Sequence, residues 1–336
     1  MPAIGLDISD KAIRFADLER KGTAFRLKDF GEELLAKDVI EEGEIVNKDE
    51  LTKALARLSE KHRIQFVKAS LPEEKAYLFR TELPKMDYGD VRGALRFKLE
   101  ENVPVPIQDA VFDYSICSAK PGSADTAMEV SVAVVSAKVA SAYIEVLTAA
   151  KLIPVVFQIE SQSIARAVVP AGDEQTYIVI AVRETKTVLA IVSESVIQYS
   201  TTLSVGGQSL VSSIKKNFSV SEAEAQKIRL GAEPKEGSEM FQSLIHAASV
   251  VRDEIQKLLV YWDSRDEGRH PVKEVIICGS DALLGLDDYL VQSIALPVRI
   301  ANVWTNIAPL GTYLPPITKR ESLDYASALG LALPYD

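Results

Sequence analysis

Residues that could hold a phosphate group stand at three turns of this 336-residue chain. Asp7 is followed by the turn Ser9-Asp10-Lys11 and then by Arg14. Gly206-Gly207 and Gly279-Ser280 each come directly after a segment rich in strand-forming residues. Backbone N–H groups, hydroxyls and cations at such turns can approach the phosphates of a nucleotide closely. These residue types are suited to a nucleotide site, and the surrounding elements decide whether they meet.

The segments around these turns are duplicated. Residues 3–31 and 177–207 each have the pattern of three short strands joined by tight polar turns, and the first turn of the second copy is Arg183-Glu184-Thr185-Lys186. Helical patterns at 47–62 and 87–101 and short strand patterns at 66–70 and 274–278 follow the two meanders. The order predicts an α/β fold with a nucleotide cleft between two similar halves.

The chain length accommodates two such halves, each with a core of its own. We expect residues 1–171 to form the first half, with a small α/β subdomain inserted at about 86–152 and a helix at 158–168 that resumes the half. Pro170-Ala171-Gly172-Asp173 marks the crossover. Residues 172–336 then form the second half, with a mostly helical insertion at about 206–270.

Composition limits the class of function. The net charge of -10 argues against nucleic acid as a partner, because binding phosphate backbones requires clustered Lys and Arg. The two cysteines, Cys117 and Cys278, and the three histidines are scattered, so we expect no metal site and no catalytic set. No apolar run approaches the roughly 20 residues that cross a bilayer. The sequence predicts a protein of the cytoplasm.

One stretch resembles a known family. Residues 94–106, with the sequence ALRFKLEENVPVP, and the following Asp113-Tyr114-Ser115-Ile116 are similar to the helix, proline stop and Asp-Tyr strand of the PilM family of type IV pilus assembly proteins. Further matches lie at 205–210, 223–227, 254–257 and 330–333, so the resemblance covers essentially the whole chain in order.

PilM belongs to the actin-like ATPase superfamily and is related to FtsA. The resemblance therefore implies an actin-like duplicated fold of two ribonuclease H-like halves, each with a small inserted subdomain. The cytoplasmic part of GspL is also similar, but that family carries a membrane helix that has no counterpart here.

The resemblance implies an ATP site, with Mg²⁺, whose phosphate and metal contacts are degraded. The first turn of the superfamily reads Asp-Ile-Gly followed by small hydroxyl residues, whereas Ser9 replaces the glycine here and Asp10 follows it. The second turn, usually Asp-Ile-Gly-Ala, appears as Ala181-Val182-Arg183-Glu184, without the carboxylate that approaches the metal. Gln158 stands where the family tends to have an acidic residue at the head of the interdomain helix.

More of the residues that the resemblance implies are present on the adenosine side of the site than on the phosphate side. Glu224 and Lys227 match positions that flank the ribose and base, and Gly279-Ser280 can form the turn under a nucleotide. The alternative for Gly206, Gly207 and Gly279 is that they are structural turns retained for backbone reasons. We expect no ATP turnover. An ATP-binding ATPase or nucleotide-gated switch that forms filaments is the alternative.

The resemblance also implies a partner. It predicts a scaffold at the inner face of the inner membrane that binds the N-terminal tail of a PilN-type membrane protein by backbone pairing along a sheet edge and by pockets beside the inserted subdomain. Contact with the membrane is expected only through that partner, and homo-oligomerisation is left open. The candidate lining residues are Leu95, Leu99, Val103, Val105 and Ile107. Ordinary core is their alternative, and it is the favoured one for Leu95 and Leu99.

Overall fold

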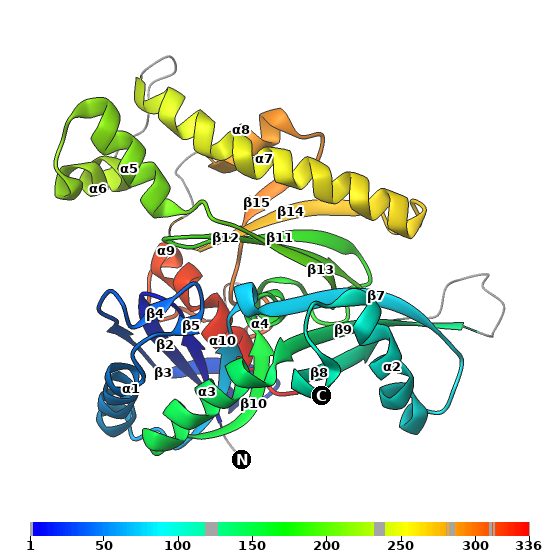
Figure 1. Cartoon of the computed structure of the whole chain (residues 1–336). Helices are drawn as coiled ribbons and strands as arrows, with labels where there is room; N and C mark the ends of the chain where they lie inside the picture. The colour runs from blue at the N-terminus through cyan, green and yellow to red at the C-terminus, as the bar shows by residue number, and fades with distance from the viewer. Residues whose placement is uncertain are drawn as a thin grey trace.

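Two five-stranded sheets form the framework of the molecule (Figure 1). The computed structural model describes residues 3–117, 127–231, 239–279, 281, 286–308, 311 and 313–335. The first sheet has the order β10-β6-β1-β2-β3, made of β1 Ile4–Ile8, β2 Ala12–Lys21, β3 Ala24–Leu34, β6 Phe66–Leu71 and β10 Ile153–Ile159. The second has the order β13-β12-β11-β14-β15, made of β11 Thr176–Val182, β12 Thr187–Ser193, β13 Val196–Leu203, β14 Val272–Cys278 and β15 Val298–Ile300.

The two sheets share one pairing plan. In the first, β1, β2 and β3 form an antiparallel meander, and β6 and β10 add in parallel beside β1. In the second, β11, β12 and β13 form the meander, and β14 and β15 add in parallel beside β11. The predicted duplication of an α/β half is therefore confirmed.

Two short helices lie between the sheets. α4 (Glu160–Val168) and α10 (Ala326–Ala332) are almost entirely buried and share one apolar core with residues of both halves. On the far side of the first sheet, α1 (Lys48–His62) and α3 (Ala137–Ala149) cover a second core, beside the short pair β4 (Ile40–Glu41) and β5 (Glu44–Ile45). The two halves are thus joined through α4 and α10.

The inserted subdomain is a three-stranded antiparallel sheet with the order β7-β9-β8 and one helix. Its elements are β7 Ala76–Pro84, α2 Tyr88–Asn102, β8 Ala110–Ile116 and β9 Ala127–Ser136, with the short helices η1 Glu73–Lys75 and η2 Ile107–Asp109. This sheet begins at residue 76 rather than at the expected position 86, because residues 76–84 pair with β9 along their whole length. Helix α3 falls within the expected bounds of the subdomain at about 86–152, but it packs into the core of the first half.

The remaining helices belong to the second half. They are α5 Gly207–Phe218, α6 Glu222–Gly231, α7 Glu239–Asp266 and α8 Leu286–Ser293, followed by α9 Lys319–Ser322 and η3 Leu323–Tyr325. Residues of α7 and α8 pack on the second sheet, whereas α5 and α6 form a small apolar cluster of their own. The expected insertion at 206–270 includes α7, but Val251, Ile255, Leu258 and Trp262 of this helix belong to the core of the second half. None of the helices in the described ranges is long and apolar enough to cross a membrane.

The secondary-structure prediction for the segment that leads into the helix at 158–168 is wrong. Residues 153–159 form the edge strand β10, and the following helix begins at Glu160 rather than at 158. An edge strand tolerates Pro154, which lacks an N–H group, and its short apolar run has no helical period. This shift moves Gln158 out of the helix and places Glu160 in its first turn.

Candidate functional site

The two predicted turns meet across the cleft between the halves through an ion pair. Arg183, directly after β11, reaches Asp7 of β1 with 3.0 Å between Nη2 and Oδ2. Its Nε lies 2.8 Å from Oε1 of Glu160, at the head of α4. Asp7 and Glu160 are 1% and 4% exposed, so one guanidinium supplies the charge for two buried carboxylates from the other half.

A second cation extends this network. Nζ of Lys186 lies 2.9 Å from Oε2 of Glu160 and 2.6 Å from Oε2 of Glu74. Burial by itself favours the neutral form of Glu160, but Lys186 and Arg183 outweigh it and lower the pKa of this carboxyl to about 2. We call Asp7, Glu74, Glu160, Arg183 and Lys186 the cleft ion network. It ties the second half to the first.

The remaining residues of the first turn have structural partners. The hydroxyl of Ser9 donates to the carbonyl of Ala12, which closes the turn. The carboxylate of Asp10 accepts hydrogen bonds from the backbone N–H groups of residues 42 and 43. Arg14 pairs with Glu32 at 2.7 Å. Lys11 lies beside them at the mouth of the cleft.

Two glycines of the second half are explained by close packing against the end of β11 and the turn that follows it. A Cβ on Gly206 would lie 2.4 Å from the carbonyl oxygen of Arg183, and one on Gly279 would lie 2.0 Å from that of Val182. Gly207 begins α5, and its N–H donates to the carbonyl of Arg183. Ser280 lies outside the described residues.

The two predicted ribose-flanking residues, Glu224 and Lys227, lie on the exposed surface of α6. The carboxylate of Glu224 accepts hydrogen bonds from the N–H and hydroxyl of Ser221, so it caps the helix. Neither residue lines the cavity between the turns. Within the described ranges, no cluster of three acidic, histidine or cysteine side chains is arranged to hold a metal ion.

The cavity between the turns measures about 50 Å³. Pockets for organic ligands measure roughly 300–1,000 Å³. The cations that line the cavity come from both turns, and those of the second turn are held by carboxylates of the cleft ion network. A Mg²⁺ ion at Asp7 or Glu160 would have to displace Arg183, so the residues present do not fit a Mg²⁺–nucleotide group in this arrangement.

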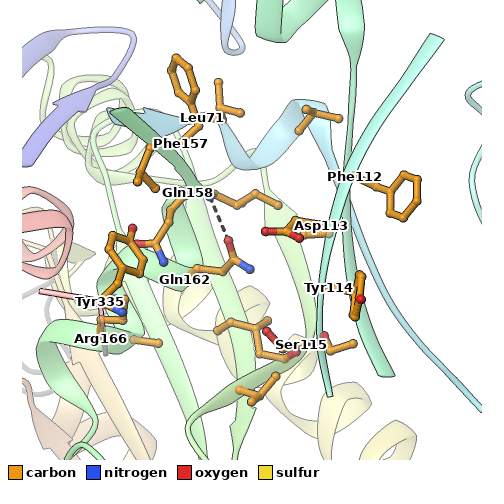
Figure 2. Close-up of a pocket in the computed structure, with 18 of the residues that line it drawn as sticks. Leu71, Phe112, Asp113, Tyr114, Ser115, Phe157, Gln158, Gln162, Arg166 and Tyr335 are labelled. Carbon is orange, nitrogen blue, oxygen red and sulfur yellow. Dashed lines mark hydrogen bonds between the residues drawn. The ribbon is translucent and has the colours of Figure 1, made fainter. Parts of the chain in front are cut away.

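A larger cavity of about 440 Å³ opens on the other side of α4 (Figure 2). Strands β8 and β9 of the inserted sheet form one wall, β10 and α4 form the second, and the β12–β13 turn and Tyr335 complete it. We call this cavity the groove. It lies where the inserted subdomain, the first sheet and the second half meet.

Polar groups project into the groove among apolar ones. Gln162 Oε1 accepts a hydrogen bond from the N–H of Ile159 at 3.1 Å, the dashed line in Figure 2. The side-chain oxygen of Gln158 is buried and has no hydrogen-bond partner among the described residues. Arg166 donates to the carbonyls of residues 330, 333 and 334 and lies 4.3 Å from the centre of the Tyr335 ring. Asp113 points from β8 toward the two glutamines.

The predicted partner-binding residues lie on the opposite face of the inserted sheet. Leu95 and Leu99 of α2 and its C-cap residue Val103 are buried in the core of the subdomain, and Val105 and Ile107 pack against that core. None of the five lines the groove. The apolar stripe of α2 packs against the sheet because a three-stranded sheet needs one covered face. For Leu95 and Leu99 the core alternative is the observed one.

Sequence reasoning missed the cleft ion network and most of the groove. Gln158 is not at the head of the interdomain helix, since Glu160 holds that position as a buried carboxylate. The alternation of residues 110–116 could have indicated the groove, because it separates Val111, Asp113 and Ser115 from the face that carries Phe112. No local pattern marks Arg183 as a partner of Asp7.

A duplicated sheet with two hairpin turns facing a cleft, and with two helices between the halves, defines an actin-like fold. The model of the type IV pilus assembly protein PilM family matches residues 5–335, and the chain belongs to that family. Both the predicted fold class and the predicted family are confirmed.

Solved structures agree on the fold. A chain of a PilM–PilN type IV pilus biogenesis complex is 19% identical, with a TM-score of 0.79 and coverage of 99% of this chain and 98% of that one. MreB 5 of Spiroplasma citri bound to AMPPNP is 14% identical, with a TM-score of 0.56 and coverage of 97% and 93%. The ethanolamine utilization protein EutJ from Carboxydothermus hydrogenoformans is 15% identical, with a TM-score of 0.54 and coverage of 98% and 88%.

Proposed function

We propose that this chain is a scaffold of type IV pilus assembly that binds the cytoplasmic N-terminal tail of a PilN-type inner-membrane protein in the groove, and reaches the membrane through that protein. The observation that carries the proposal is the 440 Å³ groove between the inserted sheet and the β10–α4 segment. The similar chain of the PilM–PilN complex supports the choice of partner.

The groove has the features of a peptide site. β8 and β10 are the end strands of their sheets, so each has one edge without a neighbouring strand in its sheet. Such edges can pair with an extended peptide, while pockets between them accept alternate side chains. The lining mixes apolar side chains, such as Val156 and Ile197, with the polar groups of Gln158 and Gln162. This mixture suits a segment with alternating apolar and polar residues.

We further propose that nucleotide binding is weakened or lost and that ATP is not turned over. Support comes from the cleft ion network, in which Arg183 and Lys186 neutralise the carboxylates that a metal ion would need. A metal ion at these carboxylates would leave Arg183 and Lys186 buried without a partner unless phosphate groups took the place of the carboxylates. An unpaired buried charge is costly in free energy. Titration of the purified protein with Mg²⁺–ATP is expected to give neither saturable binding nor phosphate release. Micromolar binding with measurable hydrolysis contradicts this proposal and favours the ATPase alternative.

Partner binding is tested by blocking the groove. Ala133 of β9 lies in its wall, and Ala133→Trp fills part of the cavity with an indole ring. We expect this variant to weaken binding of a fluorescent synthetic tail of the PilN-type protein from the same organism by more than about tenfold in anisotropy titrations. Ser141→Trp, on the exposed surface of α3, is the control and leaves affinity within about twofold. Equal affinity for the two variants places the tail elsewhere.

A further inference from the structure

Asp113 is an acidic side chain in the groove without a charge partner among the described residues. It is exposed and lines the groove wall on β8. In the described part of the chain, no cation or hydrogen-bond donor contacts its carboxylate, whereas carboxylates of the cleft ion network and many on the surface are paired. The free carboxylate is therefore available to a ligand in the groove.

The register of the inserted sheet fixes the direction of this side chain. Val111, Asp113 and Ser115 pair with Val135, Ala133 and Ser131 of β9, and all six line the groove. The alternate residues Phe112 and Tyr114 point away from it, as Figure 2 shows, and Phe112 packs in the core under α2. A strand alternates its side chains between faces, so Asp113 cannot turn away without a shift of the whole strand.

The opposite end of the groove is positive. Arg166 and Tyr335 line the groove, and Lys68, which is not one of the lining residues, contacts the same Tyr335 ring as Arg166. Both cations donate to the carbonyl of Leu333. These two cations are held by ring faces and carbonyl groups of the chain itself, and within the described ranges no ion pair joins either to a carboxylate. A cationic group of a ligand is repelled from this end and attracted to Asp113. The groove thus carries negative charge at Asp113 and positive charge at Arg166.

We propose that Asp113 recognises a Lys or Arg side chain of the tail that occupies the groove, and that it sets both the specificity and the orientation of that tail. This inference rests on the proposed function. Its chemical basis is the excess of Lys and Arg in cytoplasmic segments near the ends of membrane helices. A basic residue of an extended tail pairs with the carboxylate by a charge-assisted hydrogen bond.

The test compares two isosteric charge removals. Asp113→Asn removes the carboxylate from the groove, and Asp109→Asn removes one from the exposed η2 helix just outside it. The probe is the synthetic N-terminal tail of the PilN-type protein, with a second peptide in which each Lys and Arg is replaced by Gln. We expect Asp113→Asn to weaken binding of the basic tail about tenfold at low salt, with Asp109→Asn within about twofold of the unchanged protein.

The salt dependence and the second peptide complete the cycle. Affinity of the unchanged protein for the basic tail should fall with added salt, and Asp113→Asn should flatten this dependence. The Gln-substituted peptide should bind the unchanged protein and Asp113→Asn equally. Equal weakening by Asp113→Asn and Asp109→Asn, or no weakening by either, overturns the role of Asp113 while leaving the proposed function intact. Failure of the basic tail to bind the unchanged protein overturns both.

Discussion

Removing Arg183 tests how much the cleft ion network stabilises the protein. Arg183→Met keeps the length of the side chain but removes the charge that Asp7 and Glu160 share. After the change, Glu160 retains Lys186 at 2.9 Å, whereas Asp7 retains the hydroxyl of Ser70 at 3.0 Å. Asp7 is 1% exposed and has no access to water as a substitute. The variant therefore leaves the carboxylate of Asp7 as a buried charge without a compensating cation.

The size of the effect follows from that geometry. Breaking a buried pair by removing one partner costs about 3–5 kcal/mol of unfolding free energy, and an exposed pair is worth at most about 1 kcal/mol. Arg57, which pairs with Glu33 on the surface at 2.8 Å, provides the control Arg57→Met. The double variant Asp7→Asn/Arg183→Met removes both charges and keeps the Ser70 hydrogen bond. We expect it to recover about 2 kcal/mol or more relative to Arg183→Met alone, because no charge is left unpaired at position 7.

Urea unfolding followed by the fluorescence of the two tryptophans measures these differences. A midpoint shift for Arg183→Met no larger than that for Arg57→Met refutes the reasoning, because it means that Asp7 finds another partner or is hydrated. A double variant less stable than the single variant refutes it too, since the orphaned charge would then not be the cause.

Three further outcomes are expected. Because the network holds the pKa of Glu160 at about 2 against an ordinary 4.5, the charged carboxylate contributes about 3 kcal/mol of unfolding free energy above pH 4.5, and this contribution is lost as the pH falls toward 2. In urea titrations across that pH range, Glu160→Gln should flatten the fall of the unfolding free energy. An unchanged slope argues against the network. Gly206→Ala places a Cβ against the backbone of the second turn and should lower the melting temperature. Gly93→Ala, on α2 with open space around it, should raise the unfolding free energy by about 0.5–1 kcal/mol. Calorimetry in which both substitutions act alike contradicts the packing argument. Burial raises the pKa of the Cys278 thiol to about 12, and Cys117 is also buried, so a thiol reagent at mildly alkaline pH should modify neither residue until the protein unfolds, and rapid labelling of the native protein counts against this packing.

Local patterns predicted the elements of the fold. Periods of two and of 3.6 residues, read over about 5–15 positions, are enough to identify a strand or helix, and the meanders, α1, α2 and the strands β6 and β14 follow them. The patterns fail at residues 153–159, where a short apolar run with a proline fits either a strand or a helical lead-in. That one misplaced boundary put Gln158 in the position held by Glu160 and hid the groove wall.

The sequence by itself determined the duplication, the family and the residue types at both turns, because each depends on residues within one segment. Only the tertiary structure decided which residues those turns meet. Arg183 and Asp7 are 176 positions apart, and the groove draws its walls from β8, β9, β10, α4 and Tyr335. Contacts between such distant segments depend on how whole sheets pack and on which carboxylates become buried together. A local pattern identifies Asp113 and Arg183 as charged residues in or beside a strand, but it cannot show what each of them will meet.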